Sequence, residues 1–330
     1  MYNFSVNSKL HEVASFQEFL EEFQISDRDL LFLNKFTYQD FLANLPLPCQ
    51  LLFYEDYSTS EPSDEVVTHI LQDLQGREID RIIGVGGGSV LDTAKLLCIK
   101  DAQSYDDIYE ERVPLVRDKG LILIPTTCGT GCEMTCVSVI DRPKLQAKIG
   151  KRIECNFADH AVLIPDLLMK IPHKVFACSA IDALIHAMES YINTDANPFA
   201  MAMGEKAMEL IGGNIRKFVA RRNDPDAACA MMLGSTFAGI AFANNRLGDI
   251  HAMSHPVSAF FHVAHGVANA VLMPTIFEFN ALAADERYAN IYQYITGKEA
   301  GPDFVPQMLC DALRQLNNDL GIPACLADVG

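Results

Sequence analysis

Short apolar runs alternate with amphipathic stretches along the first half of the chain. The runs are DLLFLN, QLLFY, RIIGV, GLILIP and AVLIP, which begin at residues 29, 50, 81, 120 and 161. Helical periodicity fills several gaps between them, as in SDEVVTHILQDLQ (63–75) and SVLDTAKLLCIK (89–100). Strands that alternate with helices are typical of a parallel sheet. The pattern therefore predicts an α/β domain in this half.

The second half lacks strand-like runs. From Val175 onward, Ala, Met, Leu and Glu recur at helical periods, as in 176–192 and 202–220. This periodicity predicts an all-helical domain. Pro165 and Pro172 bracket the last strand-like segment, and the residue before a proline disfavours helix. We therefore expect two domains, 1–168 and 169–330, as the length of 330 residues also suggests.

Charge and termini narrow the classes of partner. The formal charge is −17 and the pI is near 4.8, so the surface repels phosphate backbones and anionic lipid. The start, MYNFSVNSKLHEVASF, lacks the basic and apolar regions of a secretory signal. We also expect no apolar run as long as a membrane span. The sequence thus predicts a cytoplasmic protein that binds neither nucleic acid nor membrane.

Ten cysteines raise the question of disulfides or a metal cluster. Without a secretory signal, free buried thiols are the better expectation. Cys128, Cys132 and Cys136 are spaced by four in TTCGTGCEMTCVS, but glycines interrupt any continuous helical face and no CxxC pair is present. We expect these three to be incidental thiols rather than a metal site.

Two glycine-containing loops follow predicted strands. In RIIGVGGGSVLDTAK, Gly86, Gly87 and Gly88 permit close backbone approach and positive φ. Ser89 is a natural N-cap with Asp92 three positions later, so a helix should begin there. A helix N-terminus suits a pyrophosphate, although the loop matches neither GxGxxG nor a P-loop. Alone, it fits a phosphate site and an ordinary tight turn about equally.

The second loop, GLILIPTTCGTGCEMT, strengthens the first. It presents Thr126, Thr127 and Thr130 with two glycines after another strand. Ligands of open α/β sheets gather at the carboxyl ends of strands, where hydroxyls suit a ribose or an amide. Two such loops favour dinucleotide binding over a pair of polar turns.

Histidines gather in one segment of the predicted helical domain. HAMSHPVSAFFHVAHG (251–266) holds four of the nine histidines. His251 and His255 are four apart, as are Asp182 and His186 in SAIDALIHAMES, and this spacing places both members on one helix face. His265 follows ten residues after His255, and three imidazoles from this group with the carboxylate of Asp182 would suit Fe(II) or Zn(II) better than Ca²⁺ or Mg²⁺.

Any one of these histidines could instead be a hydrogen-bonded core residue. Their clustering weighs against that alternative, because each buried histidine would need its own partner. A metal-bound water that hydrolyses a substrate is a second alternative on these residues alone. The predicted dinucleotide loops favour hydride transfer.

Four segments together resemble the iron-containing alcohol dehydrogenase family: GGGSVLDTAK, PTTCGTG, IDALIHAMESY and HAMSHPVSAFFHVAHGVANAVLMP. The resemblance runs from about Asp29 to Asn280. It implies a Rossmann-like N-terminal domain that binds the dinucleotide, a helical metal-binding C-terminal domain, and an active site in the cleft between them. It also implies NAD or NADP, Fe²⁺ or Zn²⁺, a small alcohol or aldehyde substrate, and a homodimer or higher homo-oligomer.

The resemblance assigns roles by position. The implied metal ligands are Asp182, His186, His251 and His265. The implied cofactor contacts are Asn34, Gly87, Gly88, Ser89, Asp92, Thr126, Thr127, Thr130 and Lys148. His255 matches the histidine beside the nicotinamide, where it would relay a proton or merely orient the ring. His262 is expected to have a supporting role.

Within the family, YSTSEPSDEVV, PTTCGTG and ACSAIDALIHAMESY most resemble 4-hydroxybutyrate dehydrogenases, so 4-hydroxybutyrate and succinate semialdehyde are the expected substrate pair. That branch often has Tyr at the position of His255, and NNRLGDIHAMSHP is closer to 1,3-propanediol or general alcohol dehydrogenases. Arg246 would meet the substrate carboxylate, unless it is an exposed loop arginine. A lyase similar to dehydroquinate synthase and a non-catalytic NAD-binding regulator are the remaining alternatives.

Three further positions depart from the family pattern. Asn34 stands where many members have the Asp that reads the adenosine ribose, Glu61 replaces a common Asn, and Cys132 replaces a Ser. These departures leave NADP as an alternative to NAD. The chain ends at CLADVG, where relatives carry further helices, so we expect it to be truncated.

Overall fold

The protein folds as two compact units, described here from a computed structural model that covers residues 3–261, 263–283 and 286–329. The α/β unit comprises residues 6–127 and 132–170. The helical unit begins at residue 171 and also includes residues 3–5 and 128–131. An α/β part followed by a helical part confirms the predicted fold class. The boundary after residue 168, as a division between functional domains, stays a prediction.

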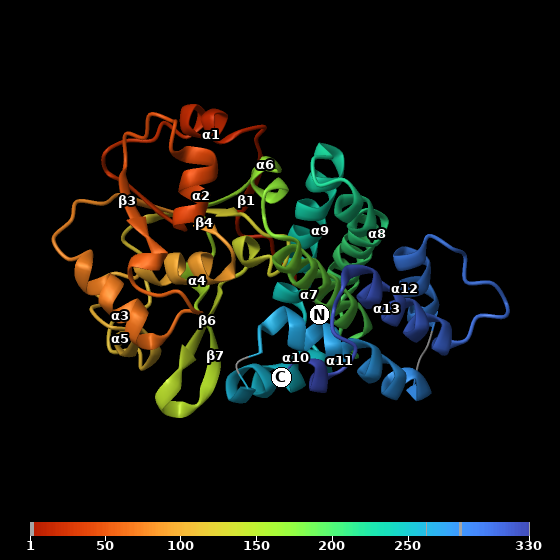
Figure 1. Ribbon diagram of the computed structural model, residues 1–330. Helices are drawn as coiled ribbons and strands as arrows, with labels where there is room; N and C mark the ends of the chain where they lie inside the picture. Colours follow the sequence, from red (N-terminus) through yellow and green to blue (C-terminus); the bar gives the residue numbers. More distant parts are fainter. Residues whose placement is uncertain (1–2, 262, 284–285, 330) are drawn as a thin grey trace. The chain divides into compact units, whose positions relative to one another are not determined.

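Six parallel strands form the sheet of the α/β unit (Figure 1). In spatial order they are β1 (Lys9–Glu12), β8 (His160–Leu163), β5 (Gly120–Pro125), β4 (Arg81–Gly86), β2 (Asp29–Leu33) and β3 (Gln50–Phe53). All five predicted apolar runs are strands, and every pairing is parallel. The edge strand β1 has the sequence KLHE, which carries no apolar run that would have predicted it.

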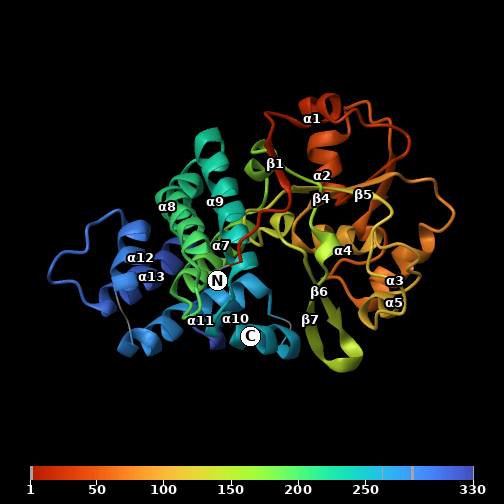
Figure 2. The same cartoon turned by 180° about the vertical axis from the view of Figure 1, so that it is seen from behind.

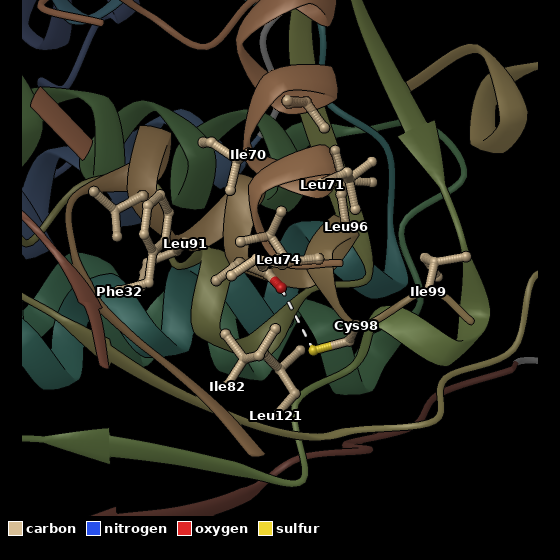
Figure 3. Packing of buried hydrophobic residues seen from close by; sticks show 14 of the residues in the cluster. Phe32, Ile70, Leu71, Leu74, Ile82, Leu91, Leu96, Cys98, Ile99 and Leu121 are labelled. Carbon is tan, nitrogen blue, oxygen red and sulfur yellow. Dashed lines mark hydrogen bonds between the residues drawn. The ribbon is translucent and has the colours of Figure 1, made fainter. Parts of the chain in front are cut away.

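The apolar runs are continuous because both faces of the sheet are covered. Leu30 and Phe32 of β2 belong to one buried cluster, whereas Leu31 and Leu33 belong to the cluster on the opposite face. The first cluster lies under α3 (Asp64–Asp73) and α4 (Gly88–Leu97), as Figure 3 shows. The second includes residues of α1 (Phe16–Glu22). The sheet is thus a rigid base for the loops at its strand ends.

A two-stranded antiparallel hairpin accompanies the sheet. It consists of β6 (Val137–Arg142) and β7 (Ala147–Arg152), and Gln146 before β7 adopts a left-handed conformation with φ of 51°. The sequence analysis did not predict this hairpin, whose strands mix apolar and charged residues. The shorter helical elements are α2 (Lys35–Thr37), a π-helix (Tyr38–Leu42), α5 (Tyr105–Tyr109) and α6 (Asp166–Met169).

The described part of the second unit is helical, as predicted. Its helices are α7 (His173–Ile192), α8 (Pro198–Ala220), α9 (Pro225–Asn244), α10 (Asp249–Phe261), α11 (His265–Asn280), α12 (Glu286–Thr296) and α13 (Pro306–Leu320). Asn197 and Asp224 cap α8 and α9, each with a proline at the next position. Helices α7, α8 and α9 pack against one another (Figures 1 and 2).

Three helices of this unit are long and apolar enough to cross a membrane, by length and composition alone. They are His173–Ile192, Pro225–Asn244 and His265–Ala283. The expectation that no apolar run reaches this length was therefore wrong. Their apolar windows are 78%, 61% and 50% buried inside the fold, so tertiary packing accounts for much of this apolar surface.

Candidate metal centre and cofactor loops

The four predicted metal ligands converge within the helical unit. Asp182 and His186 lie one turn apart on α7, His251 lies on α10, and His265 is the first residue of α11. The Oδ1 atom of Asp182 is 3.7 Å from Nε2 of His251 and 3.8 Å from Nε2 of His265. Nδ1 of His186 is 4.0 Å from Oδ2 of Asp182. Side chains from three helices therefore meet around one carboxylate.

The chemistry of this cluster fits a borderline divalent metal. Asp182, His186 and His251 offer ligand atoms within 4.8 Å of one another and are 3%, 5% and 3% exposed. Nδ1 of His186 is buried without a hydrogen-bond partner among the described residues, which is costly unless another group satisfies it. One carboxylate with imidazoles is a donor set for Fe(II) or Zn(II). The assignment as metal ligands stays a prediction.

Burial and mutual charge set the ionisation of this cluster. Burial alone would raise the pKa of Asp182, but the neighbouring histidines hold it well below its usual range. Burial lowers the pKa of His186 to about 4. Burial also opposes the charged form of His251, yet Asp182 and Glu189 raise its pKa to about 9. The carboxylates thus favour positive charge at the centre of the cluster.

Two polar side chains that the sequence analysis missed contact the cluster. Oε2 of Glu189 lies 2.6 Å from Nδ1 of His251. Nδ2 of Asn269 lies 2.6 Å from Oδ1 of Asp182 and 3.1 Å from Nε2 of both His251 and His265. Helical spacing could have identified them, because Glu189 is seven positions after Asp182 and Asn269 is four after His265, which places each on the same helix face as a predicted ligand.

The other predicted residues of this unit differ in their surroundings. His255 is half-buried, and its ring centroid is 5.3 Å from that of His265 and 6.3 Å from that of His251. His262 lies outside the described residues. Arg246 is exposed in the loop between α9 and α10. Its role toward a substrate stays a prediction.

The predicted cofactor loops meet at adjacent strand ends in the α/β unit. Asn34 follows β2, Gly87 follows β4 and Thr127 follows β5, and these strands are neighbours in the sheet. The amide of Thr126 donates to the carbonyl of Gly86 at 3.0 Å. Open α/β sheets bind ligands at this edge. The edge therefore has the position and backbone character of a dinucleotide site.

The start of α4 corrects one prediction. The helix begins at Gly88 with Gly87 as its N-cap, so Ser89 lies inside the first turn and is not the cap. Its intended partner Asp92 is engaged elsewhere, because its Oδ1 accepts from Nζ of Lys95 at 3.1 Å and its Oδ2 accepts from the amide of Val139 at 3.0 Å.

Glycine permits a positive φ at positions 86, 87 and 88, and none of the three adopts it. Glycine is needed at position 86 for a different reason, because any side chain there would collide with Val90. A Cβ there would lie 2.6 Å from Cβ of Val90. At Gly87 the nearest side-chain atom would be Cγ2 of Thr127, at 3.4 Å. The turn is therefore tight at Gly86 and roomier at Gly87.

Carboxylates engage three polar groups on the cofactor side. Nδ2 of Asn34 donates to Oε1 of Glu55 at 3.1 Å, and the amide of Lys35 donates to Oε2 of Glu55 at 2.9 Å. Lys148 pairs with Glu61, a position singled out in the sequence. The remaining predicted contact, Thr130, lies in the segment 128–131 that clusters with the helical unit.

The ten cysteines are free thiols, as expected, but only five of them are buried, four are half-buried and Cys325 is exposed. Cys128, Cys132 and Cys136 are all buried. Among the described residues, the only group of three potential ligand side chains that could hold a metal is the Asp182, His186 and His251 group. The three cysteines form no such group among the described residues, and their interpretation as incidental thiols stays a prediction.

Comparison with known proteins agrees with this arrangement. The model of the family "Iron-containing alcohol dehydrogenase" matches residues 8–165, and that of the "Fe-containing alcohol dehydrogenase family, C-terminal" matches residues 176–330. The 4-hydroxybutyrate dehydrogenase of Clostridium kluyveri is 40% identical over 79% of this chain and 71% of its own length. The sulfoacetaldehyde reductase of Bilophila wadsworthia is 36% identical over 82% of this chain and 71% of its own.

A solved structure extends the likeness to the fold. The crystal structure of a 1,3-propanediol oxidoreductase superposes with a TM-score of 0.87 at 27% identity, and covers 100% of this chain and 90% of that one. Family models matching both halves, a relative at 40% identity and a cluster of one aspartate and histidines agree. The chain belongs to the iron-containing alcohol dehydrogenase family and is an oxidoreductase.

Proposed function

We propose that this protein interconverts 4-hydroxybutyrate and succinate semialdehyde with NAD, at a divalent metal held by Asp182, His186, His251 and His265. The observation that carries the metal site is the convergence of ligand atoms from three helices around Asp182, within 3.7–4.0 Å. Fe(II) is our first choice of metal because of the family, and Zn(II) suits the same ligands.

When bound, the metal would supply Lewis acidity that stabilises negative charge on the alcohol oxygen, and the dinucleotide would supply the hydride acceptor. Asp182 stays ionised at neutral pH because its pKa is depressed, so it contributes a full negative charge toward a cation. His186 stays neutral because its pKa is about 4, so one of its two ring nitrogens keeps a lone pair that is free to ligate a metal. His255, half-buried beside His265, is the candidate to carry the released proton outward.

NAD is favoured over NADP by the carboxylate beside Asn34. Glu55 accepts hydrogen bonds from the side chain of Asn34 and the amide of Lys35. Glu55 follows β3, and its contacts with Asn34 and Lys35 place its carboxylate beside the end of β2, where an acidic side chain suits the ribose hydroxyls of NAD and repels the extra phosphate of NADP. The contacts proposed for the dinucleotide remain Asn34, Gly87, Gly88, Ser89, Asp92, Thr126, Thr127, Thr130 and Lys148. For Asp92 the role is indirect, because both carboxylate oxygens bond within the protein.

The choice of substrate rests on the relative at 40% identity, which is a 4-hydroxybutyrate dehydrogenase. The sulfoacetaldehyde reductase at 36% identity is also named for a substrate with an anionic end. A neutral diol is the second candidate, because the solved structure at a TM-score of 0.87 is a 1,3-propanediol oxidoreductase.

A panel of alcohols distinguishes the two candidates. Nicotinamide absorbance would be followed with 4-hydroxybutyrate, 1,3-propanediol and butan-1-ol, with Fe(II) and Zn(II) loaded separately and with NAD⁺ and NADP⁺ in parallel. We expect the highest kcat/KM for 4-hydroxybutyrate with NAD⁺. A higher kcat/KM for 1,3-propanediol would replace the substrate while leaving the reaction class intact.

Net charge, buried apolar helices and exposed aromatic side chains bear on where the protein is found and how it assembles. A net charge of −17 and the burial of the apolar helices support a cytoplasmic protein. Exposed aromatic side chains at Phe260, Phe261 and Phe279 support a homodimer or higher homo-oligomer, because such side chains often mark contacts between subunits. Size-exclusion chromatography with light scattering would measure the oligomeric state.

A further inference from the structure

Glu189 is a buried carboxylate to which the proposed reaction assigns no role. It lies on α7, seven positions after Asp182, and is 3% exposed. Oε1 accepts from the amide of Ile250 at 2.6 Å, and Oε2 lies 2.6 Å from Nδ1 of His251. Burying an ionised carboxylate is costly unless it is fully hydrogen-bonded, and both of its oxygens are. The carboxylate therefore joins the start of α10 to a predicted metal ligand.

The contact with Glu189 determines which nitrogen of His251 faces the cluster. An ionised carboxylate only accepts hydrogen bonds, so Nδ1 of His251 must carry a proton. The other nitrogen, Nε2, then faces Oδ1 of Asp182 at 3.7 Å, where a bound metal would replace its proton. A histidine that ligates through Nε2 needs this arrangement, and its orientation is set by the hydrogen bond at Nδ1.

A glycine at position 248 provides the space that the Glu189 side chain occupies. Gly248 precedes α10, and a Cβ at that position would lie 3.0 Å from Oε1 and 3.3 Å from Cδ of Glu189. Its φ is not positive, so the backbone conformation does not demand glycine. Glycine is needed at position 248 because a larger side chain would crowd the carboxylate of Glu189. Gly248, three residues before His251, thus packs directly against the Glu189 carboxylate that contacts His251.

We propose that Glu189 is the positioning residue of the metal site, which fixes the tautomer and ring orientation of His251 and thereby sets the affinity for the metal. This inference rests on the ligand set given under Proposed function. A purely structural role, as a hydrogen-bond acceptor at the start of α10, is the competing explanation. The two differ in one respect: a structural acceptor needs only Oε1, whereas the positioning role needs a carboxylate oxygen at Nδ1 of His251.

Glu189→Gln separates these roles. The amide oxygen of glutamine still accepts from the amide of Ile250, but its NH₂ group faces Nδ1 of His251 and cannot accept from it. Co²⁺ titration of the full-length protein, stripped of metal beforehand, would give the dissociation constant, and the visible spectrum of bound Co²⁺ would report its coordination. We expect affinity to fall about 10- to 100-fold with an altered spectrum. A dissociation constant within about threefold of wild type would overturn the proposal.

Asn317→Ala is the matched control. Asn317 is also buried in the helical unit at 6% exposure, and its side chain donates to the carbonyl of Ala270 at 2.6 Å. Its loss should lower the melting temperature and leave Co²⁺ affinity unchanged. Equal losses of Co²⁺ affinity in both variants would mean that Glu189 acts only through general stability, which contradicts the proposal.

Two further variants keep the test decisive. If Glu189→Gln fails to fold, Gly248→Ala displaces the same carboxylate from outside, and an unchanged Co²⁺ affinity in that variant would overturn the proposal. Asp182→Ala tests the ligand set itself and should abolish tight Co²⁺ binding. If Asp182→Ala binds Co²⁺ as wild type does, the ligand set is wrong. If Asp182→Ala loses tight Co²⁺ binding while Glu189→Gln binds Co²⁺ as wild type does, the ligand set stands and only the role proposed for Glu189 is wrong.

Discussion

At the scale of single residues, burial separates side chains of the same type into inert and reactive groups. Burial raises the pKa of Cys98 and of Cys128 to about 12. Cys98 lies inside the cluster under α3 and α4 and donates to the carbonyl of Ala94 at 3.5 Å (Figure 3). Cys325, in contrast, is exposed. Because thiolate is the reactive form, these thiols should differ in rate.

Alkylation tests this difference. At pH 8, a thiol with a pKa of about 12 is ionised in roughly one molecule in 10⁴, and burial removes access as well. We expect iodoacetamide to modify Cys325 at least about 100-fold faster than Cys98 or Cys128 in the folded protein. Peptide mass spectrometry would measure the rates, and unfolding in urea should remove the difference. Comparable rates in the folded state would contradict the burial of the two thiols.

Arg246 concerns substrate choice. It is exposed five residues before His251, and a guanidinium suits the carboxylate of 4-hydroxybutyrate. If it meets that group, Arg246→Ala would remove a charged hydrogen bond worth about 1.5–3 kcal/mol, or about 10- to 100-fold in kcat/KM. The loss should appear with 4-hydroxybutyrate and be absent with butan-1-ol. An equal loss with both would show that Arg246 shapes the site without recognising charge.

Sequence spacing paired Asp182 with His186, and the family resemblance supplied the rest of the ligand set, but neither identified the side chains that support it. Asp182 and His186 were predictable because a spacing of four places them on one helix face. Glu189 and Asn269 have the same helical spacing relative to the predicted ligands. Polar residues on helices usually face solvent, however, and the amino-acid sequence does not show that these two are buried. Their roles depend on contacts between α7, α10 and α11, which spacing along one helix does not reveal.

At the scale of elements, the length and continuity of apolar runs decided what was predictable. The five buried strands were found because helices cover both faces and make each run continuous. Strand β1 and the hairpin of β6 and β7 were missed because their positions mix polar and apolar residues. The N-cap of α4 was placed at Ser89, two residues after the observed cap Gly87, and the expected capping partner Asp92 bonds with Lys95 and Val139 instead.

The turn before α4 gives a prediction at this scale. Gly87→Ala should fold and lose no more than about 1 kcal/mol in the free energy of unfolding, because alanine is a weaker N-cap than glycine but its Cβ would meet only the Thr127 side chain, with Cγ2 at 3.4 Å and Oγ1 at 3.6 Å. It should weaken NADH binding about tenfold if the backbone contacts the pyrophosphate, because the methyl group blocks close approach. Fluorescence titration with NADH would measure the dissociation constant. Unchanged affinity would remove this turn from the cofactor site.

Gly86→Ala is the contrasting variant. Its Cβ would lie 2.6 Å from Cβ of Val90, which is too close for any ordinary contact. We expect a loss of about 1–3 kcal/mol in the free energy of unfolding, because the strand or the helix must shift. Urea denaturation would measure this loss. A variant as stable as Gly87→Ala would mean that the turn is less tightly packed than the structure shows.

At the scale of the whole molecule, the two proposed tasks belong to separately packed units, except that the proposed cofactor contact Thr130 lies in the segment 128–131 of the helical unit. The candidate metal ligands lie between Asp182 and His265, entirely within the helical unit. The glycine turn and its neighbours Asn34 and Thr127 lie entirely within the α/β unit. Each unit has its own buried core, so loss of the metal should leave the dinucleotide loops folded.

Chelation tests this separation. Prolonged dialysis against EDTA should abolish alcohol oxidation, whereas NADH should still saturate the protein with a dissociation constant within about twofold of that of the metal-loaded form. Re-addition of Fe(II) under anaerobic conditions, or of Zn(II), should restore turnover. Full activity in the chelated protein would show that the cluster around Asp182 is not a catalytic metal site. Loss of NADH binding together with activity would instead show that the dinucleotide loops depend on the metal, and that the two units do not act separately.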